Sequence, residues 1–387
     1  MNKSQLRRHF SDVEWARIRA LADTQQTPFL VVHLDTVRAK YQELREGFPT
    51  AKIYYAVKAN PAPEVLNLLA GLGCCFDIAS RYELDLVMGL GVTPDRISYG
   101  NTIKKAVDVR YAYEKGVRVF ASDSEMDVRR IAREAPGAHL HIRVLTEGTE
   151  TADWPLSRKF GCQQEMVVDM ILLARELGLD PAGISFHVGS QQRDLGAWDA
   201  ALAKVKFIFD KLESHGVKLR QINMGGGFPA HYVNRTHEIP HYCEEITRFL
   251  QEDFGDEMPE IMLEPGRSLV GESGVIVSEV VLISRKSRYG LHRWVYTDIG
   301  VFGGLIETLG ESIKYPIFTE RQGKPEEAVL SGPTCDSMDI MYEDNKVPLP
   351  LSLEEGDRLY WLSTGAYTTS YSSIAFNGFP PLKAYFV

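Results

Sequence analysis

The chain has 387 residues and a formal net charge of −9, with 44% hydrophobic and 25% charged residues. That length can hold a full barrel and a second, smaller domain, and the composition is that of a globular protein. The acidic balance disfavours nucleic acid and anionic membranes as partners, and no run approaches the ~18 apolar residues of a membrane span. We therefore expect neither kind of partner.

Between residues 52 and 270, a short β-rich run is followed by a helix-length amphipathic segment, and this pattern occurs eight times. Most runs are continuously apolar, which is typical of parallel strands covered on both faces. Eight such units in this length predict a (β/α)8 barrel; the alternative, an open doubly wound sheet, seldom needs eight. The runs begin at Lys52, Cys74, Arg96, Val117, His139, Gly183, Gln221 and Ile261.

After about residue 270, short β-like runs follow one another without helices between them. This pattern predicts a mostly antiparallel β domain. The early run from Pro28 precedes the first barrel unit, and we expect it to join that second domain. The barrel should therefore span residues 36–270, and the β domain residues 1–35 and 271–387.

The cysteines are odd in number and match neither a disulfide framework nor a metal site. The N-terminal segment has no apolar core of a signal peptide. We therefore expect a cytoplasmic protein. The five cysteines are Cys74, Cys75, Cys162, Cys243 and Cys335.

Chemistry in such a barrel takes place where strands give way to the loops that follow them. Lys58 ends the first run, in an otherwise apolar segment. A buried lysine loses its proton more easily, which suits it to Schiff-base formation, although an isolated lysine at a strand end more often extends into solvent. His187 ends the sixth run and could be a core histidine or a ring stacked on a planar cofactor; taken alone, it favours the core. Asp77 and Arg143 end the second and fifth runs.

Two neighbouring loops have the features of a phosphate site. Gly225–Gly227 follow the seventh run and can offer backbone N–H groups, and Pro265–Arg267 follow the eighth. Loops after strands seven and eight are the usual phosphate site of such barrels, although a glycine turn also occurs without a ligand. Glu264 could pair with Arg267, or it could lie against a pyridine nitrogen and keep it protonated, so that the ring withdraws electrons.

Seven motifs in this order resemble the fold type III (alanine-racemase-like) enzymes that use pyridoxal 5′-phosphate (PLP), and among them the ornithine/lysine decarboxylases. The motifs, spread over nearly the whole chain, are YAVKAN, FDIAS, HVGSQ, GGGF, EPGR, GPTCDSMD and GAYT. The resemblance implies that Lys58 holds PLP as an imine, that His187 stacks on its ring and that Glu264 contacts the pyridine nitrogen. The other residues implied to bind, line or support the cofactor are Asp77, Glu83, Arg143, Ser190, Gly226, Gly227, Gly266, Arg267 and Tyr367.

The resemblance also assigns substrate chemistry to the second domain. Cys335 corresponds to the acid that protonates the carbanion after CO2 leaves, and Asp336 to the carboxylate that holds the distal ammonium of a diamino acid. In the family both come from the partner subunit, which implies a homodimer with shared active sites. By counting, Glu311 falls near a substrate-contacting aspartate. Decarboxylation does need an electron sink, although a free cysteine such as Cys335 is more often a small buried hydrophobe.

The chain departs from the family pattern in DIGVFGGLIETLGES, where eukaryotic ornithine decarboxylases read closer to NDGVYGSFN and Phe302 stands where a tyrosine is common. This leaves the choice between ornithine and lysine open. Diaminopimelate decarboxylases typically carry CESGD where this chain has CDSMD, which disfavours that activity.

The leading hypothesis is PLP-dependent decarboxylation of L-ornithine to putrescine, a step of polyamine biosynthesis, with activity on L-lysine left open. The alternatives are a lysine or diaminopimelate decarboxylase, an amino-acid racemase, and a catalytically dead paralogue that binds a regulatory protein. Retention of four residues together, Lys58, Glu264, Cys335 and Asp336, argues against the last alternative.

Overall fold

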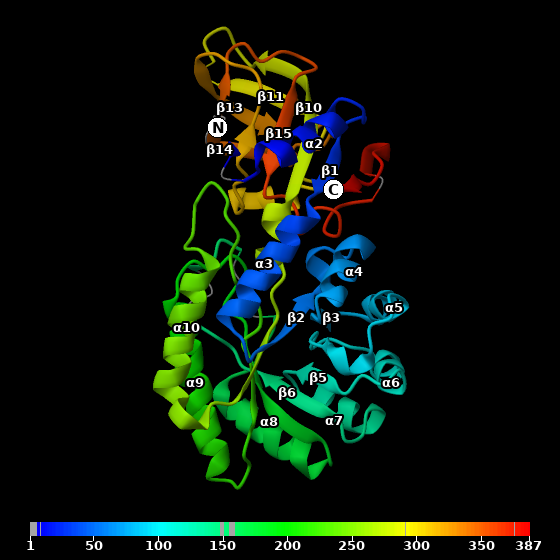
Figure 1. Cartoon of the computed structure of the whole chain (residues 1–387), viewed down its shortest axis with the longest axis vertical. Coiled ribbons are helices and arrows are strands. Elements are labelled where there is room, and N and C mark those ends of the chain that lie inside the picture. Colours follow the sequence, from blue (N-terminus) through cyan, green and yellow to red (C-terminus); the bar gives the residue numbers. More distant parts are fainter. Residues whose placement is uncertain (1–5, 8, 148–150, 155–158, 291, 375) are drawn as a thin grey trace. The chain divides into compact units, whose positions relative to one another are not determined.

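The structure is a computed structural model that describes residues 6–7, 9–147, 151–154, 159–290, 292–374 and 376–387 (Figure 1). Its contacts divide the chain into two compact units, each of which is described by itself. The barrel unit comprises Arg38–Pro229 and Thr236–Ser268. The β unit comprises Met1–Val37, Ala230–Arg235 and Leu269–Val387.

The barrel unit is built on a closed ring of eight parallel strands that follow one another in chain order. The ring closes where the last strand pairs with the first, with Lys52 opposite Met262 and Ile53 opposite Leu263. This arrangement confirms the predicted (β/α)8 barrel. The strands are β2 (Lys52–Ala56), β3 (Cys75–Ile78), β4 (Ile97–Tyr99), β5 (Val119–Ser122), β6 (His139–Arg143), β7 (Asp180–Ser185), β8 (Gln221–Asn223) and β9 (Glu260–Leu263).

Helices surround this ring (Figure 1), and in the chain they lie between successive strands, before the first strand and after the last. In α7 the side chain of Ser124 accepts a hydrogen bond from the Asp127 N–H, as its Ser-x-x-Asp pattern predicts, and Val128 and Ile131 are buried. Helices cover one face of each strand, and the side chains that fill the barrel cover the other. The strands therefore carry apolar residues on both faces. The helices are α3 (Leu34–Gly47), α4 (Pro63–Gly71), α5 (Arg81–Gly89), α6 (Ala106–Glu114), α7 (Glu125–Glu134), α8 (Gln164–Glu176), α9 (Gly196–Glu213), α10 (Ile239–Phe254) and the short α11 (Arg267–Val270).

The β unit contains one sheet with the strand order β12-β15-β10-β11-β13-β14, in which β1 pairs with β10 and β16. Its pairs are antiparallel except β1 with β16 and β11 with β13, which are parallel. The expected mostly antiparallel second domain is therefore confirmed. The strands are β1 (Phe29–Val32), β10 (Gly274–Arg285), β11 (Arg293–Thr297), β12 (Ile317–Phe318), β13 (Pro325–Ser331), β14 (Ile340–Pro350), β15 (Arg358–Leu362) and β16 (Lys383–Phe386).

Helix α2 (Asp12–Ala22) supplies part of the core of the β unit. It begins with a capping box between Ser11 and Glu14, which satisfies backbone N–H groups at both positions. Its residues Ile18 and Ala22 are fully buried against strand residues such as Phe29. The run that begins at Pro28 thus lies in this sheet, paired with β10.

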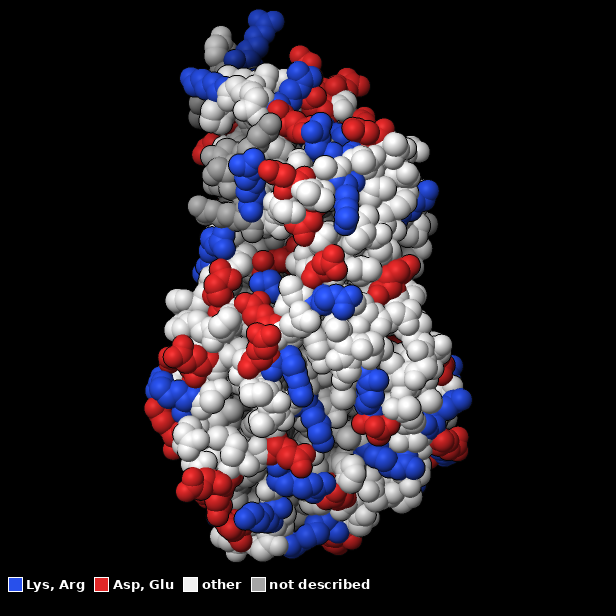
Figure 2. Space-filling view, in the orientation of Figure 1, with Lys and Arg blue, Asp and Glu red and all other residues white. Residues whose placement is uncertain are grey.

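Basic and acidic side chains are interspersed over the face that Figure 2 shows. Exposed ion pairs within one helix include Arg129 with Glu125 and Arg248 with Glu252. Among the described helices, none is both long enough and apolar enough to cross a membrane.

One ion pair lies inside the barrel unit. The Lys104 side chain is fully buried, and its Nζ donates to the backbone oxygens of Asn101 and Ala121 and to Asp127 Oδ2 at 2.8 Å. Replacing Lys104 with methionine should lower the free energy of unfolding by about 3 kcal/mol, because removing one partner leaves a buried charge. Arg130 still contacts the Asp127 carboxylate, which keeps the loss at the lower end of the usual range.

Urea unfolding followed by circular dichroism measures this loss. The matched control is Lys206→Met, which removes a lysine from the surface pair with Asp210 and should change stability by less than about 1 kcal/mol. Equal urea midpoints for the two variants would contradict a structural role for the buried pair.

Candidate active site

The polar residues expected at the strand ends lie at one end of the barrel, because all its strands run in parallel. Lys58 lies in the short 3-10 turn η1 (Val57–Ala59), directly after β2. Asp77 lies in β3, opposite Ala56 in the register, and Glu264 directly follows β9. The Ala56 N–H donates to Pro265 O at 3.0 Å, so the segment of Lys58 and the segment of Glu264 are hydrogen-bonded neighbours.

Lys58 is exposed, while its neighbours Val57 and Ala59 are buried. Burial is thus not what prepares this amine for imine formation, contrary to the argument from the sequence. Burial raises the pKa of the Asp77 and Glu83 carboxyl groups, and the nearby Lys58 opposes that rise at both. The Lys58 amine thus lies near the carboxyl groups of Asp77 and Glu83 at the end of the barrel.

A buried carboxyl group and a half-buried guanidinium, those of Asp77 and Arg143, belong to the same end of the barrel. Asp77 is 7% exposed, and its Oδ1 accepts the Gly100 N–H at 3.0 Å. Burial, and next the nearby Glu264 carboxylate, raise the pKa of Asp77 well above its usual range. Burial lowers the pKa of Arg143, and nearby carboxylates, Glu264 foremost, oppose that shift. Asp77, Arg143 and Glu264 therefore form one electrostatic cluster.

Glu83 and His187 are each held by backbone groups. Glu83 Oε2 accepts the Ala79 N–H at 2.6 Å. His187 Nδ1 accepts the Gly189 N–H at 3.0 Å, which fixes the ring in the tautomer with hydrogen on Nε2. Burial, together with the cations Arg143 and Lys58, lowers the pKa of His187 well below its usual range, so the imidazole is neutral. A neutral ring held by one edge leaves its faces available for stacking.

An anion-binding group lies beside this histidine. The Arg267 side chain is 3% exposed and donates Nε and Nη2 to Ser190 Oγ at 3.2 and 3.1 Å. The glycine loop Gly225–Gly227 packs directly on the loop of His187 and Ser190. Gly227 has φ +102, and a Cβ there would lie 2.8 Å from Gly189 O. Only glycine permits this close approach of the two backbones. The N–H groups of the glycine loop therefore lie near the guanidinium of Arg267.

Gly226 and Gly266 complete the two loops. A Cβ on Gly226 would lie 2.6 Å from Glu264 O and 3.4 Å from His187 Nε2, so this glycine brings the loop against both residues. Gly266 is buried between Glu264 and Arg267. The structure therefore unites the barrel residues that the sequence singled out.

Sequence reasoning missed Asn223, which ends β8. It is 1% exposed, and its side chain contacts both Glu264 and the backbone of Gly225. Its position two residues before the glycine loop was the only signal available.

The remaining predicted residues lie in the β unit. Cys335 is exposed, so the reading of this cysteine as a buried hydrophobe is wrong. Its N–H donates to Asn377 Oδ1 at 3.0 Å, and Asp336 Oδ1 accepts the Met338 N–H at 2.8 Å. The buried carboxylate of Asp339 holds the turn.

The bonds of Asp339 explain why the Cys335–Asp336 turn is fixed. Its Oδ1 accepts the Val301 N–H, and its Oδ2 accepts both the N–H and the hydroxyl of Thr334. A Cβ on Gly300 or Gly332 would overlap this carboxylate, so both glycines are required. The thiol of Cys335 is thus displayed on an anchored turn.

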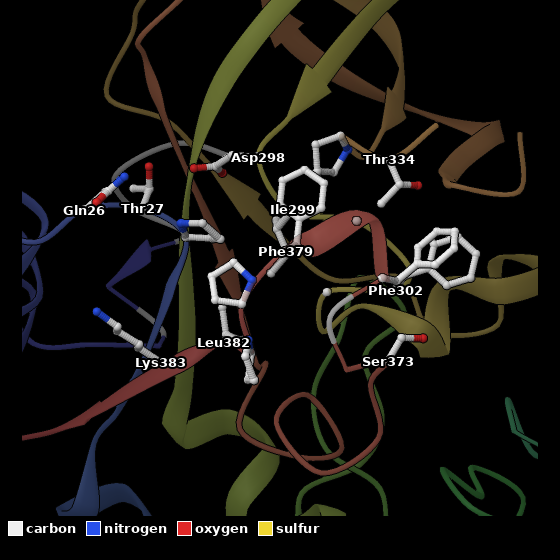
Figure 3. A pocket seen from close by; sticks show the side chains of 17 residues that line it. Gln26, Thr27, Asp298, Ile299, Phe302, Thr334, Ser373, Phe379, Leu382 and Lys383 are labelled. Carbon is white, nitrogen blue, oxygen red and sulfur yellow. The ribbon is translucent and has the colours of Figure 1, made fainter. Parts of the chain in front are cut away.

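A cavity of about 150 Å³ lies next to this turn, within the β unit (Figure 3). Pro333 and Thr334 line it, as does Phe302, whose ring contacts Phe376 with centroids 4.8 Å apart. The Asp298 carboxylate also lines it, and burial raises the pKa of Asp298. Phe302, which departs from the family pattern, therefore packs against Phe376, and the next residue, Asn377, accepts the N–H of Cys335.

Glu311 and Tyr367 both have positive φ, +53 and +59 respectively. The Glu311 carboxylate accepts the N–H groups of residues 343–345 and the side chain of Asn345, all on β14. Burial would raise the pKa of Glu311, but these hydrogen bonds outweigh it and lower the pKa. Glu311 thus holds the backbone of β14 at the irregularity between Tyr342 and Val347, where the pairing with β13 shifts register. A substrate contact for Glu311, and the phosphate contact for Tyr367, stay predictions.

Comparison with known proteins identifies the family. A family model described as "Pyridoxal-dependent decarboxylase, pyridoxal binding domain" matches residues 34–271. The lysine/ornithine decarboxylase of Selenomonas ruminantium is 34% identical over 363 residues, which cover 94% of this chain and 90% of that protein. Among solved structures, SrLDC in complex with PLP and cadaverine is 32% identical with a TM-score of 0.87, and 97% of this chain and 94% of that one are covered. The lysine/ornithine decarboxylase of Vibrio vulnificus, complexed with cadaverine, is 29% identical with a TM-score of 0.87 and covers 98% and 99%.

The fold and these matches define a PLP-dependent amino-acid decarboxylase. The chain belongs to the fold type III ornithine/lysine decarboxylase family. The expected family and cofactor are therefore confirmed.

The donors at the carboxyl end of the barrel fit the cofactor chemically. Arg267, Ser190 and the glycine loop suit a phosphate, the Glu264 carboxylate suits a pyridine nitrogen, and the Lys58 amine suits an aldehyde. Each of the three functional groups of PLP has a partner of matching chemistry in this one unit.

Proposed function

We propose that the chain catalyses decarboxylation of L-ornithine to putrescine. The observation that supports it most is that one chain contains both groups of residues. The barrel unit has donors for every functional group of PLP, and the β unit has the exposed Cys335 and Asp336 on one anchored turn. The similarity to lysine/ornithine decarboxylases adds support, because the Vibrio vulnificus protein has been solved with cadaverine and with putrescine. L-Lysine is the second candidate substrate on the same ground.

Each barrel residue has a role in the proposal. Lys58 holds the cofactor covalently, while Ser190, Arg267 and the glycine loop bind its phosphate. Glu264 keeps a proton on the pyridine nitrogen, and the neutral His187 covers the ring without adding charge. When bound, PLP supplies an electron sink for the electron pair that departing CO2 leaves on Cα. Asp77, Glu83 and Arg143 surround these groups and set the local charge.

The β unit supplies the other half of the proposed chemistry. The Cys335 thiol donates a proton to Cα after CO2 has left, and the Asp336 carboxylate binds the distal ammonium. The family resemblance places these two residues in the site of the partner subunit, so we propose a homodimer with two shared active sites. Their exposure in the single chain is consistent with that use.

Replacing Asp336 with alanine should raise KM for L-ornithine by roughly tenfold to a hundredfold, because a hydrogen bond between charged groups contributes about 1.5–3 kcal/mol. L-Norvaline, which lacks the distal amine, should be affected much less. Steady-state kinetics with both substrates measure the difference. Asp344→Ala, which removes another exposed carboxylate of the β unit, is the matched control and should change neither KM. Equal losses on both substrates would show that Asp336 does not recognise the distal amine.

Product analysis tests the proposed function. L-Ornithine, L-lysine, L-arginine and diaminopimelate are offered separately, and CO2 and the amines are quantified. The proposal expects putrescine from L-ornithine with the highest kcat/KM. A clear preference for lysine would assign the second candidate, and racemised amino acid without CO2 would reject decarboxylation of these substrates.

A further inference from the structure

Asn223 occupies a particular place in the barrel. It is the last residue of β8, lies opposite Ser185 on β7 and Met262 on β9, and is 1% exposed. Its side-chain Oδ1 accepts the Gly225 N–H at 2.9 Å, and its Nδ2 donates to Glu264 Oε1 at 2.5 Å. The orientation of the amide is determined, because the Gly225 N–H can only donate and must therefore face the oxygen.

These bonds form a closed cycle with one further bond. The Glu264 N–H donates to Gly225 O at 2.7 Å, so Gly225, Asn223 and Glu264 are joined in a ring of three hydrogen bonds. Gly225 has φ +63, and a Cβ there would lie 2.2 Å from Phe186 O, so the loop packs directly on the backbone that follows β7. The cycle thus fixes the Glu264 carboxylate relative to the glycine loop.

The bond to Asn223 engages one of the two carboxylate oxygens of Glu264. Among the described residues, the Asn223 side chain is the one donor to this carboxylate, and Oε2 accepts no hydrogen bond. One oxygen is therefore held and the other remains available.

We propose that Asn223 is a positioning residue that couples the carboxylate assigned to the pyridine nitrogen to the loop assigned to the phosphate. The Asn223 side chain thereby sets the distance between the Glu264 carboxylate, which would contact the pyridine nitrogen, and the glycine loop, which would bind the phosphate. This inference rests on the roles proposed above for Glu264 and for the glycine loop. It predicts that Asn223 acts on turnover through Glu264.

A double-mutant cycle tests this coupling. N223L should lower kcat about tenfold to a hundredfold with KM nearly unchanged, the size of effect found when a residue that orients a functional ligand is removed. In an E264Q background the same substitution should change kcat less than about twofold, because the group through which Asn223 acts has already been lost. Gln221→Leu, at the other end of β8, is the matched control and should change kcat in neither background.

A second reading does not depend on turnover. The affinity of the apoenzyme for PLP should fall more on N223L than its affinity for pyridoxal, because pyridoxal lacks the phosphate that the glycine loop receives. N223D should recover most of the kcat lost in N223L, since its carboxyl group can accept the Gly225 N–H with one oxygen and, when protonated, donate to Glu264 with the other. Circular dichroism confirms that each variant is folded.

Equal losses of kcat in the wild-type and E264Q backgrounds would overturn the proposal, as would an N223D variant no better than N223L. The failure of the underlying assignment is distinguishable, because near-normal turnover of E264Q alone would reject the role of Glu264 whatever Asn223 does.

Discussion

Replacing Glu264 with alanine is expected to lower kcat by about a thousandfold or more while PLP remains bound. The carboxylate keeps the ring nitrogen protonated, and without it the electron sink weakens in the step that releases CO2. Binding should survive, because Arg267, Ser190 and Lys58 are untouched. Steady-state kinetics and the cofactor absorbance of the purified variant measure the two effects separately.

Glu260→Ala is the matched control for this prediction. Glu260 lies at the opposite end of β9 and contacts Lys52 and Gln221 on the surface. Its removal should leave kcat within about twofold, as is usual for exposed ion pairs away from the chemistry. Turnover of Glu264→Ala close to that of the control would contradict the pyridinium argument.

The second large effect is a recovery of activity from two inactive variants. Lys58→Ala removes the covalent anchor in the barrel unit, and Cys335→Ala removes the proton donor in the β unit, so each homodimer should be nearly inactive. When the two are unfolded together and refolded as a mixture, half of the dimers are hybrids with one doubly defective site and one intact site. Activity should therefore return to about one quarter of the wild-type value, from two-fold symmetry alone.

The same mixture distinguishes a shared site from a site within one subunit. In the latter case every site keeps one defect, and no activity returns. Subunit exchange is verified independently with two affinity tags, one on each variant. An inactive mixture with exchanged dimers would exclude the shared active site.

The barrel could be predicted because its signal is local and repeated. Each strand is a short apolar run, each helix has its own spacing and cap, and a parallel ring brings all strand ends to one place. Lys58, His187 and Glu264 could thus be grouped from their positions after strands alone. For the same reason the glycine loop could be assigned to the phosphate side.

Contacts between side chains on different strands could not be predicted in this way. The bond from Asn223 to Glu264 spans 41 residues and depends on the register of β8 and β9. Glu311 binds the backbone of β14 more than 30 residues away, whereas counting along the motif placed it near a substrate contact. The sequence also left open whether Lys58 is buried or extends into solvent, and the turn η1 exposes it while its neighbours are covered.

Covalent labelling of Lys58 tests the central claim most directly. The purified enzyme is reduced with borohydride, digested and mapped by mass spectrometry. The account predicts a pyridoxyl group on Lys58. Burial lowers the pKa of Lys104, a second lysine of the barrel unit, but its Nζ is committed to Asp127 and two backbone oxygens, so it serves as an internal negative control. A pyridoxyl group on Lys104 or any other lysine, or no label at all, would contradict the account.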